Sequence, residues 1–258
     1  MREIKKISIV MCLLLAALML KWNKINVQAA TPFVTNCAVD VKQKVRKTTF
    51  IAKQYRVGTD YRYKIVMKKN GKNKVIAKNT TCAFATDGKT LYYVACGKKV
   101  DDYRYQNTIY KYNIKTGKKS KVVSGTDYTI LGCSGTYLYC GTDLYAGGVD
   151  LYAVHVKTKK KVYMRDCAGS VDYIDNRIVV STNTGAPGNY PIYSFKLNGT
   201  GKKKIADGGM IKTKGKLIYY FVIDEKNWKF KIYTCSATGK NKKAITGWIE
   251  RIPDEYYK

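Results

Sequence analysis

Few residues in this sequence could act as catalytic groups. His155 is the only histidine, and catalysis by a serine or cysteine nucleophile usually needs a positioned base. No G-x-S-x-G motif is present, and Ser170 in AGSVD does not form one. The spacing predicts that His155 lies on the more polar face of a strand, as an exposed or hydrogen-bonded side chain. We therefore expect no hydrolytic triad.

Carboxylate chemistry leaves one enzymatic alternative. Glycoside hydrolysis uses paired carboxylates, and beyond residue 29 the glutamates are Glu225, Glu250 and Glu255. Glu225 could pair in space with Asp101 or Asp143. A glycosidase that acts on a polysaccharide is kept as the alternative to a protein without catalysis, which is the main prediction.

The cysteines do not suggest a metal site. Beyond residue 29 there are seven, and none forms a C-x-x-C motif, so a zinc site is disfavoured. The segment at 141–150 has two acids, fewer than a calcium site usually needs. We expect no cofactor and no metal, and we expect Cys235 to be a small buried hydrophobic residue.

Aromatic and acidic residues recur in four segments that we name the loop face: 97–107, 141–150, 182–191 and 223–228. Rings that pack against C–H groups, with carboxylates and amides beside them, suit a sugar or a peptide. Alternatively, these aromatics only cap the ends of the sheets. The predicted ligand-binding residues are Asp101, Tyr103, Tyr105, Asp143, Tyr145, Asn183, Tyr190, Asp224 and Trp228.

A second cluster is basic. The chain has 48 Lys+Arg against 18 Asp+Glu, a net charge of +30, and most of the excess is lysine, which attracts anions without reading bases. We expect anionic wall polymers as partners and no specific nucleic acid. Alternatively, the lysines only keep molecules apart, or they anchor a wall-associated scaffold. The lysine rim comprises Lys118, Lys119, Lys159, Lys160, Lys161, Lys202, Lys203, Lys204, Lys242 and Lys243.

The first residues predict export. A basic start precedes an apolar run from Ile7 to Leu20, and small residues follow near Ala29, which is the pattern of a signal peptide over 1–29. An uncleaved anchor is the alternative, although the run is shorter than the roughly 20 residues that a membrane span needs. We expect residues 30–258 to be secreted and extracellular, with association to the cell surface as a further prediction.

A repeat accounts for the placement of both clusters. Similar segments begin at Ile109, Leu151, Ile192 and Ile232, at spacings of 42, 41 and 40 residues. Their apolar residues alternate with period two, which predicts strands rather than helices. One face of these strands is apolar, and the other, with Ala153, Ser194 and Thr234 among its members, is more polar.

Each repeat contains four short strands, which is the content of a propeller blade. We predict an all-β protein, a single β-propeller over 30–258 of four-stranded antiparallel blades, with five blades and six as the alternative. This strand order puts the loop face and the lysine rim at opposite ends of the blades. Segment 249–258 is expected to latch onto the first blade. The predicted blades are about 35–79, 80–125, 126–169, 170–208 and 209–248.

Two segments carry a resemblance to known families. ATDGKTLYYV at 85–94 resembles the repeat of TolB-like propellers, and LYCGTD at 138–143 is similar to a degenerate YWTD-type blade of lipoprotein-receptor propellers. The whole pattern resembles secreted clostridial propeller domains of unknown function. The resemblance implies a propeller but no catalytic residue, because propellers host many activities. The predicted function is a secreted binding module for a glycan, peptide or protein at the cell surface.

Overall fold

A computed structural model describes residues 42–45, 47–58, 60–101, 104–144, 148–182 and 188–256. These residues form strands and turns, with one short 3-10 helix, η2 (Asp254–Tyr256). The all-β prediction is confirmed. The predicted signal segment, 1–29, lies outside the described residues. Within the described ranges, no helix has the length and apolar character that crossing a membrane requires.

The strands form three antiparallel sheets in which sequence neighbours pair. The first sheet contains β1 (Lys42–Val45), β2 (Thr48–Val57), β3 (Asp60–Lys69), β4 (Lys72–Thr86), β5 (Thr90–Ala95), β6 (Gln106–Asn113) and β7 (Lys119–Thr126). The second contains β8 (Tyr128–Cys133), β9 (Tyr137–Asp143), β10 (Val149–His155), β11 (Lys161–Ile174), β12 (Arg177–Thr182), β13 (Pro191–Lys196) and β14 (Lys203–Asp207). The third contains β15 (Gly209–Lys214), β16 (Leu217–Asp224), β17 (Lys229–Cys235) and β18 (Lys243–Ala244).

Two long strands, β4 and β11, each pair irregularly with the strand that follows. The register of β4 against β5 shifts between Thr80 and Phe84, and the register of β11 against β12 shifts between Ala168 and Ser170. When β4 and β11 are divided at these irregularities, the three sheets contain five groups of four strands. The divisions fall where the repeat places blade boundaries. The boundaries and the number of blades stay predictions.

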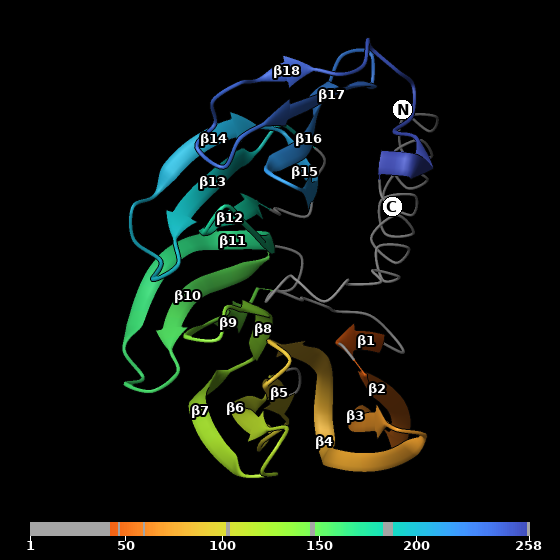
Figure 1. The fold of residues 1–258 in the computed structure, drawn as a ribbon, viewed down its shortest axis with the longest axis vertical. Coiled ribbons are helices and arrows are strands. Elements are labelled where there is room, and N and C mark those ends of the chain that lie inside the picture. Colours follow the sequence, from red (N-terminus) through yellow and green to blue (C-terminus); the bar gives the residue numbers. More distant parts are fainter. Residues whose placement is uncertain are drawn as a thin grey trace.

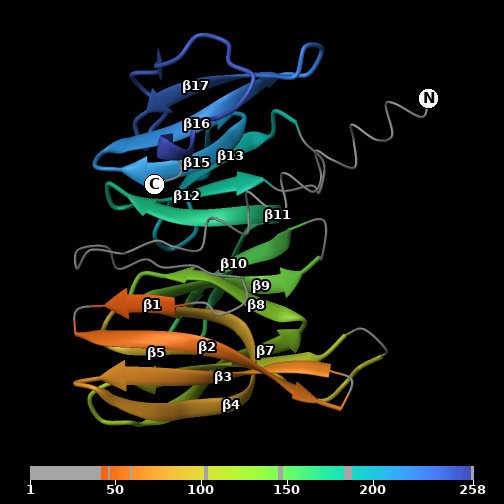
Figure 2. The ribbon, with the colours of Figure 1, turned by 90° about the vertical axis from the view of Figure 1, so that its right-hand side faces the viewer.

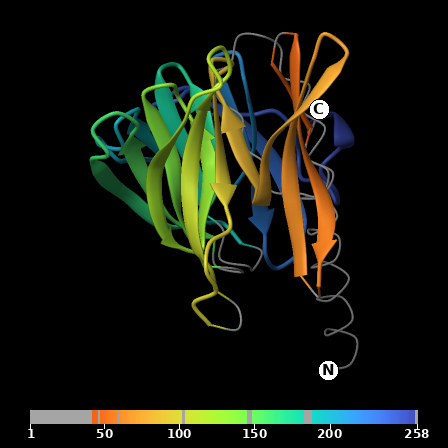
Figure 3. The ribbon, with the colours of Figure 1, turned by 90° about the horizontal axis from the view of Figure 1, so that it is seen from below.

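The sheets are arranged along an arc, with β1–β3 at one end and β15–β18 at the other (Figure 1). Seen from the side, the strands from β17 to β8 lie one above another, whereas β1–β4 overlap β5 and β7 in this view (Figure 2). The strands run between two rims, and the segment between β5 and β6 projects from one of them (Figure 3). Among the described strands, no sheet combines β1–β7 with β15–β18.

The hairpin turns follow from local sequence. Asn70 and Gly71 have φ of 49° and 74°, and Asp175 and Asn176 have φ of 48° and 58°. Two-residue hairpin loops with positive φ at both positions match the twist of the flanking strands, and Asn, Asp and Gly adopt such angles most readily. These dipeptides therefore set the registers of β3 on β4 and of β11 on β12.

The core consists of apolar layers between neighbouring groups of strands. Val94, Ile130 and Val154 belong to one layer, between the β4–β7 strands and the β8–β11 strands. The more polar face of the strands is also covered in part, because Ala153 and Ser194 are fully buried. A sheet packed on both sides buries both faces, so small polar residues are enclosed with the apolar ones.

Segment 249–256 does not lie where the sequence suggested. Instead of contacting the first group of strands, Ile249 pairs with Phe230 of β17, and Ile252 packs on Ile232 of the same strand. The expected latch onto the first blade is replaced, among the described residues, by contacts with the last sheet. The reason is the apolar outer face of that sheet, which lies nearest in sequence.

Candidate functional site

Backbone hydrogen bonds join the loop face to the turns between successive groups of strands. The amide of Asp127 donates to the carbonyl of Tyr105 (2.8 Å), and the amide of Asp143 donates to the carbonyl of Asp127 (3.0 Å). Gly208 N–H likewise donates to Tyr190 O (2.8 Å). These bonds place the β5–β6 and β9–β10 loops at the same rim, as the strand order predicts.

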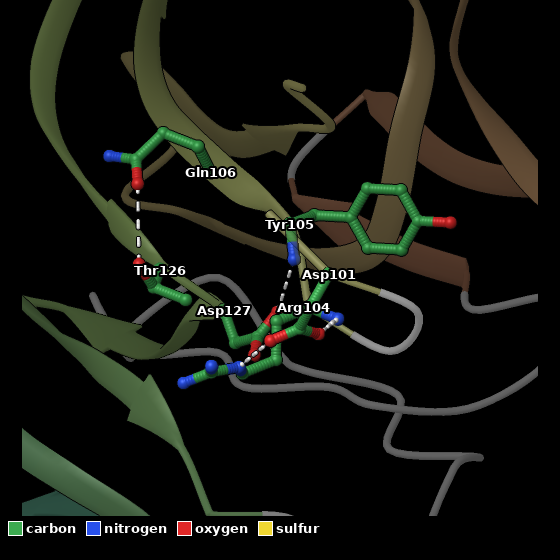
Figure 4. A network of polar contacts seen from close by, with 6 residues as sticks. All are labelled: Asp101, Arg104, Tyr105, Gln106, Thr126 and Asp127. Atoms are coloured by element: carbon green, nitrogen blue, oxygen red, sulfur yellow. Dashed lines mark hydrogen bonds and ion pairs between the residues drawn. The ribbon is translucent and has the colours of Figure 1, made fainter. Parts of the chain in front are cut away.

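Side chains strengthen this junction (Figure 4). The backbone amide of Tyr105 donates to Asp127 Oδ1 (2.9 Å). Arg104 donates to Asp101 twice, from its amide to Oδ1 (2.9 Å) and from Nε to Oδ2 (2.6 Å). The carboxylate of Asp101 is thus held by its own loop, and its first role is to shape the turn.

Tyr105 is also anchored to the first strands. Its hydroxyl donates to Asp60 Oδ2 (2.9 Å), and the guanidinium of Arg62 lies 4.5 Å from the centre of its ring. Arg62 donates to the same Asp60 oxygen (3.0 Å). Burial alone would lower the pKa of Arg62, but its contact with Tyr105 and the charge of Asp60 raise it overall. Tyr105 therefore links the loop to β3 through both its ring and its hydroxyl.

A second group of loop-face residues surrounds the β16–β17 hairpin. Asn189 exchanges two hydrogen bonds of 2.8 Å with the backbone of Ile223, which brings the loop containing Tyr190 beside the end of β16. Asp224 accepts from Asn227 Nδ2 (2.9 Å) and from turn amides. These hydrogen bonds lower the pKa of Asp224, so this carboxylate holds the turn in its ionised form.

Trp228 stands out at this hairpin. Its side chain is 42% exposed, and its φ of 53° lies in the left-handed region, which is costly for a bulky residue. Lys159, at the equivalent position of the β10–β11 turn, has φ of 65°, so this conformation belongs to the turn. The exposed ring is the feature of Trp228 that a ligand could contact.

The predicted ligand-binding residues therefore fall into two groups. In the first group, Asp101 and Tyr105 lie between β5 and β6, and Asp143 is the last residue of β9. In the second group, Tyr190, Asp224 and Trp228 lie beside the turn between β16 and β17. The remaining three predicted residues, Tyr103, Tyr145 and Asn183, lie outside the described residues.

Three further residues of the first group were not predicted from the sequence: Asp60, Arg62 and Asp127. Asp60 and Tyr105 are 45 positions apart, so no motif joins them. The one available signal was the rarity of arginine in a lysine-rich chain, because arginine suits stacked and paired sites.

The described residues offer little for chemistry. His155 Nδ1 lies 3.1 Å from the amide nitrogen of Thr158, and its ring packs edge-on against Tyr137, so it is a satisfied structural residue. Glu225 is exposed in the β16–β17 turn. No cluster of three or more potential metal ligands occurs within the described ranges.

The lysine rim lies at the opposite end of the strands. All ten of its lysines are exposed, and Lys204 alone forms an ion pair with a described residue, Asp207 (2.8 Å). Some are held over tyrosine rings: Lys119 Nζ lies 4.0 Å from the ring centre of Tyr110, and Lys202 Nζ lies 4.4 Å from that of Tyr193. Cation–π contact orders these ammonium groups without removing their charge.

Known structures support the fold. No family model matches the chain, and no curated protein matches it in sequence. The chain is similar to acylaminoacyl peptidase from Pyrococcus horikoshii, with 14% identity and a TM-score of 0.57 over 88% of this chain and 40% of that one. It is also similar to the β-propeller domain of the Trilobed protease from Pyrococcus furiosus, whose description reports an open velcro topology.

That propeller domain matches with 13% identity and a TM-score of 0.55, over 82% of this chain and 71% of the other. TolB from Acinetobacter baumannii matches with 14% identity and a TM-score of 0.45, over 79% of this chain and 53% of that one. The chain thus spans about half of the TolB chain and less than half of the peptidase. At these identities the likeness concerns the fold, and this chain has a β-propeller fold.

Proposed function

We propose that this chain is a non-catalytic, secreted propeller module that binds a glycan or a peptide at its loop face. The observation that carries the proposal is Trp228, an exposed aromatic ring in the turn between β16 and β17. Tyr190 lies near the same hairpin end and would supply a polar contact, whereas Asp224 holds the turn. The likeness to secreted clostridial and YWTD-type propellers belongs to this proposal as well.

The two groups of loop-face residues have different roles in the proposed ligand binding. Asp101 and Tyr105 have their polar atoms engaged by Arg104, Asp60 and Asp127, so they would stiffen the rim. Trp228 would make the ligand contact, because an exposed ring can stack on a sugar face or an aromatic peptide side chain.

Substitution of Trp228 by glycine tests the proposal directly. Glycine adopts positive φ without a steric penalty, so Trp228→Gly should fold normally while it removes the ring. The matched control is Tyr163→Ala, which removes an aromatic ring that is 54% exposed and lies in β11, two residues from Lys161 of the lysine rim. Both variants and the original protein would be applied to an array of glycans, wall polymers and peptides at about 50 and 300 mM salt, where screening differs.

We expect one ligand family to be retained by the original protein and by Tyr163→Ala at the higher salt, and lost by Trp228→Gly. Retention of that ligand by Trp228→Gly would contradict the placement of the site. Hydrolysis of any polysaccharide on the array, abolished by Glu225→Gln, would replace the proposal by the glycosidase alternative.

The lysine rim would add a diffuse attraction to anionic wall polymers. Lys118, Lys160 and Lys203 are exposed, and charged groups at such positions act over about 10 Å at 0.1 M salt. Replacement of all three by glutamine should weaken binding to an anionic polymer at the lower salt and leave the loop-face ligand unaffected. Equal loss of both ligands would show that the two ends of the strands do not act separately.

A further inference from the structure

The outer face of the last sheet is apolar, and among the described strands none follows it along the chain. One face of β15–β18 packs on the preceding strands through Ile218, Tyr220 and Cys235. Because side chains alternate along a strand, the neighbouring positions point the other way. That opposite face carries Tyr219, Phe221, Phe230, Ile232 and Ile245.

Segment 249–256 covers this face. The backbone of Ile249 exchanges two hydrogen bonds of 2.8 Å with Phe230, which extends the β17 ladder by a single bridge. Ile252 packs on Ile232 and is only 5% exposed. Tyr256, in η2, packs against the same cluster. The segment thus supplies apolar side chains where other groups of strands have a neighbour.

Polar contacts fasten the edges of the segment. Lys212 of β15 donates to the carbonyl of Glu255 (3.0 Å), and its ammonium lies 5.5 Å from the centre of the Tyr219 ring. Lys229 forms an ion pair with Glu250 (3.2 Å). Each of these contacts is exposed or half-buried, so the buried side chain of Ile252 contributes most to holding the segment.

We propose that segment 249–256 is a cap, which takes the place of a neighbouring sheet on the outer face of β15–β18 and prevents that face from binding a second copy of this chain. The physical reason is that the apolar side chains of this face would otherwise be exposed to water. Exposed apolar patches of this kind drive association, and an identical patch on a second molecule is its simplest complement. Repeat arrays use end caps with a polar outer surface for the same purpose.

The polar outer surface of the segment fits this role. Glu250, Arg251, Asp254 and Glu255 are all exposed, and Arg251 donates to Asp254 within the segment (3.0 Å). The segment therefore presents apolar residues to the sheet and charged residues to water.

Two variants test the cap. The first chain stops at Trp248, and the second keeps the whole segment but carries Ile252→Ser. The matched control is Glu255→Gln, which alters an exposed side chain whose residue contacts Lys212 through its backbone oxygen. Molar mass would be measured by light scattering over a series of protein concentrations. The binding of an apolar fluorescent dye would be measured on the same samples.

We expect the chain that stops at Trp248 to double its molar mass as concentration rises and to bind the dye. Ile252→Ser should show the same change at higher concentration, and Glu255→Gln should behave like the original protein. A synthetic peptide of residues 249–258, added in trans, should restore the original mass. Unchanged mass and dye binding in both variants would overturn the proposal. Loss of β-structure on truncation, seen by circular dichroism, would also overturn it, because the segment would then be part of the core.

Discussion

Tyr105 offers a sharp test of whether the loop face is built on the first strands. Its hydroxyl donates to Asp60 (2.9 Å) and its ring lies under Arg62 (4.5 Å). Tyr105→Phe removes only the hydroxyl. Asp60 keeps its ion pair with Arg62, so no buried acceptor is left without a partner, and we expect a loss of about 0.5–1 kcal/mol in the free energy of unfolding.

Tyr105→Ala removes the ring as well. It should cost a further ~1 kcal/mol for the cation–π contact and ~1 kcal/mol for lost apolar burial of a half-buried ring, giving about 3 kcal/mol in total. For a chain of this size, 1 kcal/mol corresponds to roughly 2–4 °C in Tm. The expected decreases in Tm are therefore about 2 °C for the phenylalanine variant and about 9 °C for the alanine variant.

The assay is thermal unfolding followed by circular dichroism, with Tyr61→Ala as the control. Tyr61 lies in the same strand, β3, and is 61% exposed, so its removal should change the free energy of unfolding by no more than about 0.5 kcal/mol. A Tyr105→Ala variant as stable as Tyr61→Ala would refute the reasoning. Tyr105 would then be an independent exposed aromatic, as the ligand hypothesis first supposed.

Three further predictions concern the core. Gly141→Ala should prevent folding, because the added Cβ would lie 1.6 Å from a backbone oxygen of β10. The control Gly247→Ala should be neutral, because there is open space around that residue. Equal expression and equal Tm of the two variants would contradict this prediction. Burial raises the pKa of Asp172, which accepts a hydrogen bond from a threonine of β15. The folded state therefore binds more protons than the unfolded state, and stability should fall as pH rises above about 4; in urea titrations Asp172→Asn should remove that decline, and an unchanged slope would exclude the assignment. Burial raises the pKa of Cys140 to about 12 and that of Cys235 to about 11. Neither thiol should therefore react with a disulfide reagent near pH 8 until urea unfolds the protein. Rapid reaction of either thiol in the folded protein would be inconsistent with its buried position.

Local patterns in the sequence were enough for the architecture. Alternating residues in the segments from Ile109, Leu151 and Ile192 predict strands, and the repeat predicts their order. Dipeptides such as Asn70-Gly71 predict hairpins, because positive φ is a property of single residues. The exposure of the lysines follows from the same reasoning, since turns at the ends of strands face water.

The same patterns could not show which polar groups meet. Asp60 and Arg62 reach Tyr105 only because two groups of strands pack side by side, and 45 positions separate Asp60 from Tyr105. The burial of Ser194, on a face that alternation marks as polar, likewise depends on a neighbouring sheet.

Periodicity therefore determines strands and their order, because both depend on residues close in sequence. The tertiary structure alone decides which side of each sheet is covered and which carboxylates are engaged, because these depend on contacts between distant segments. The packing of Ile252 on the last sheet belongs to this second kind.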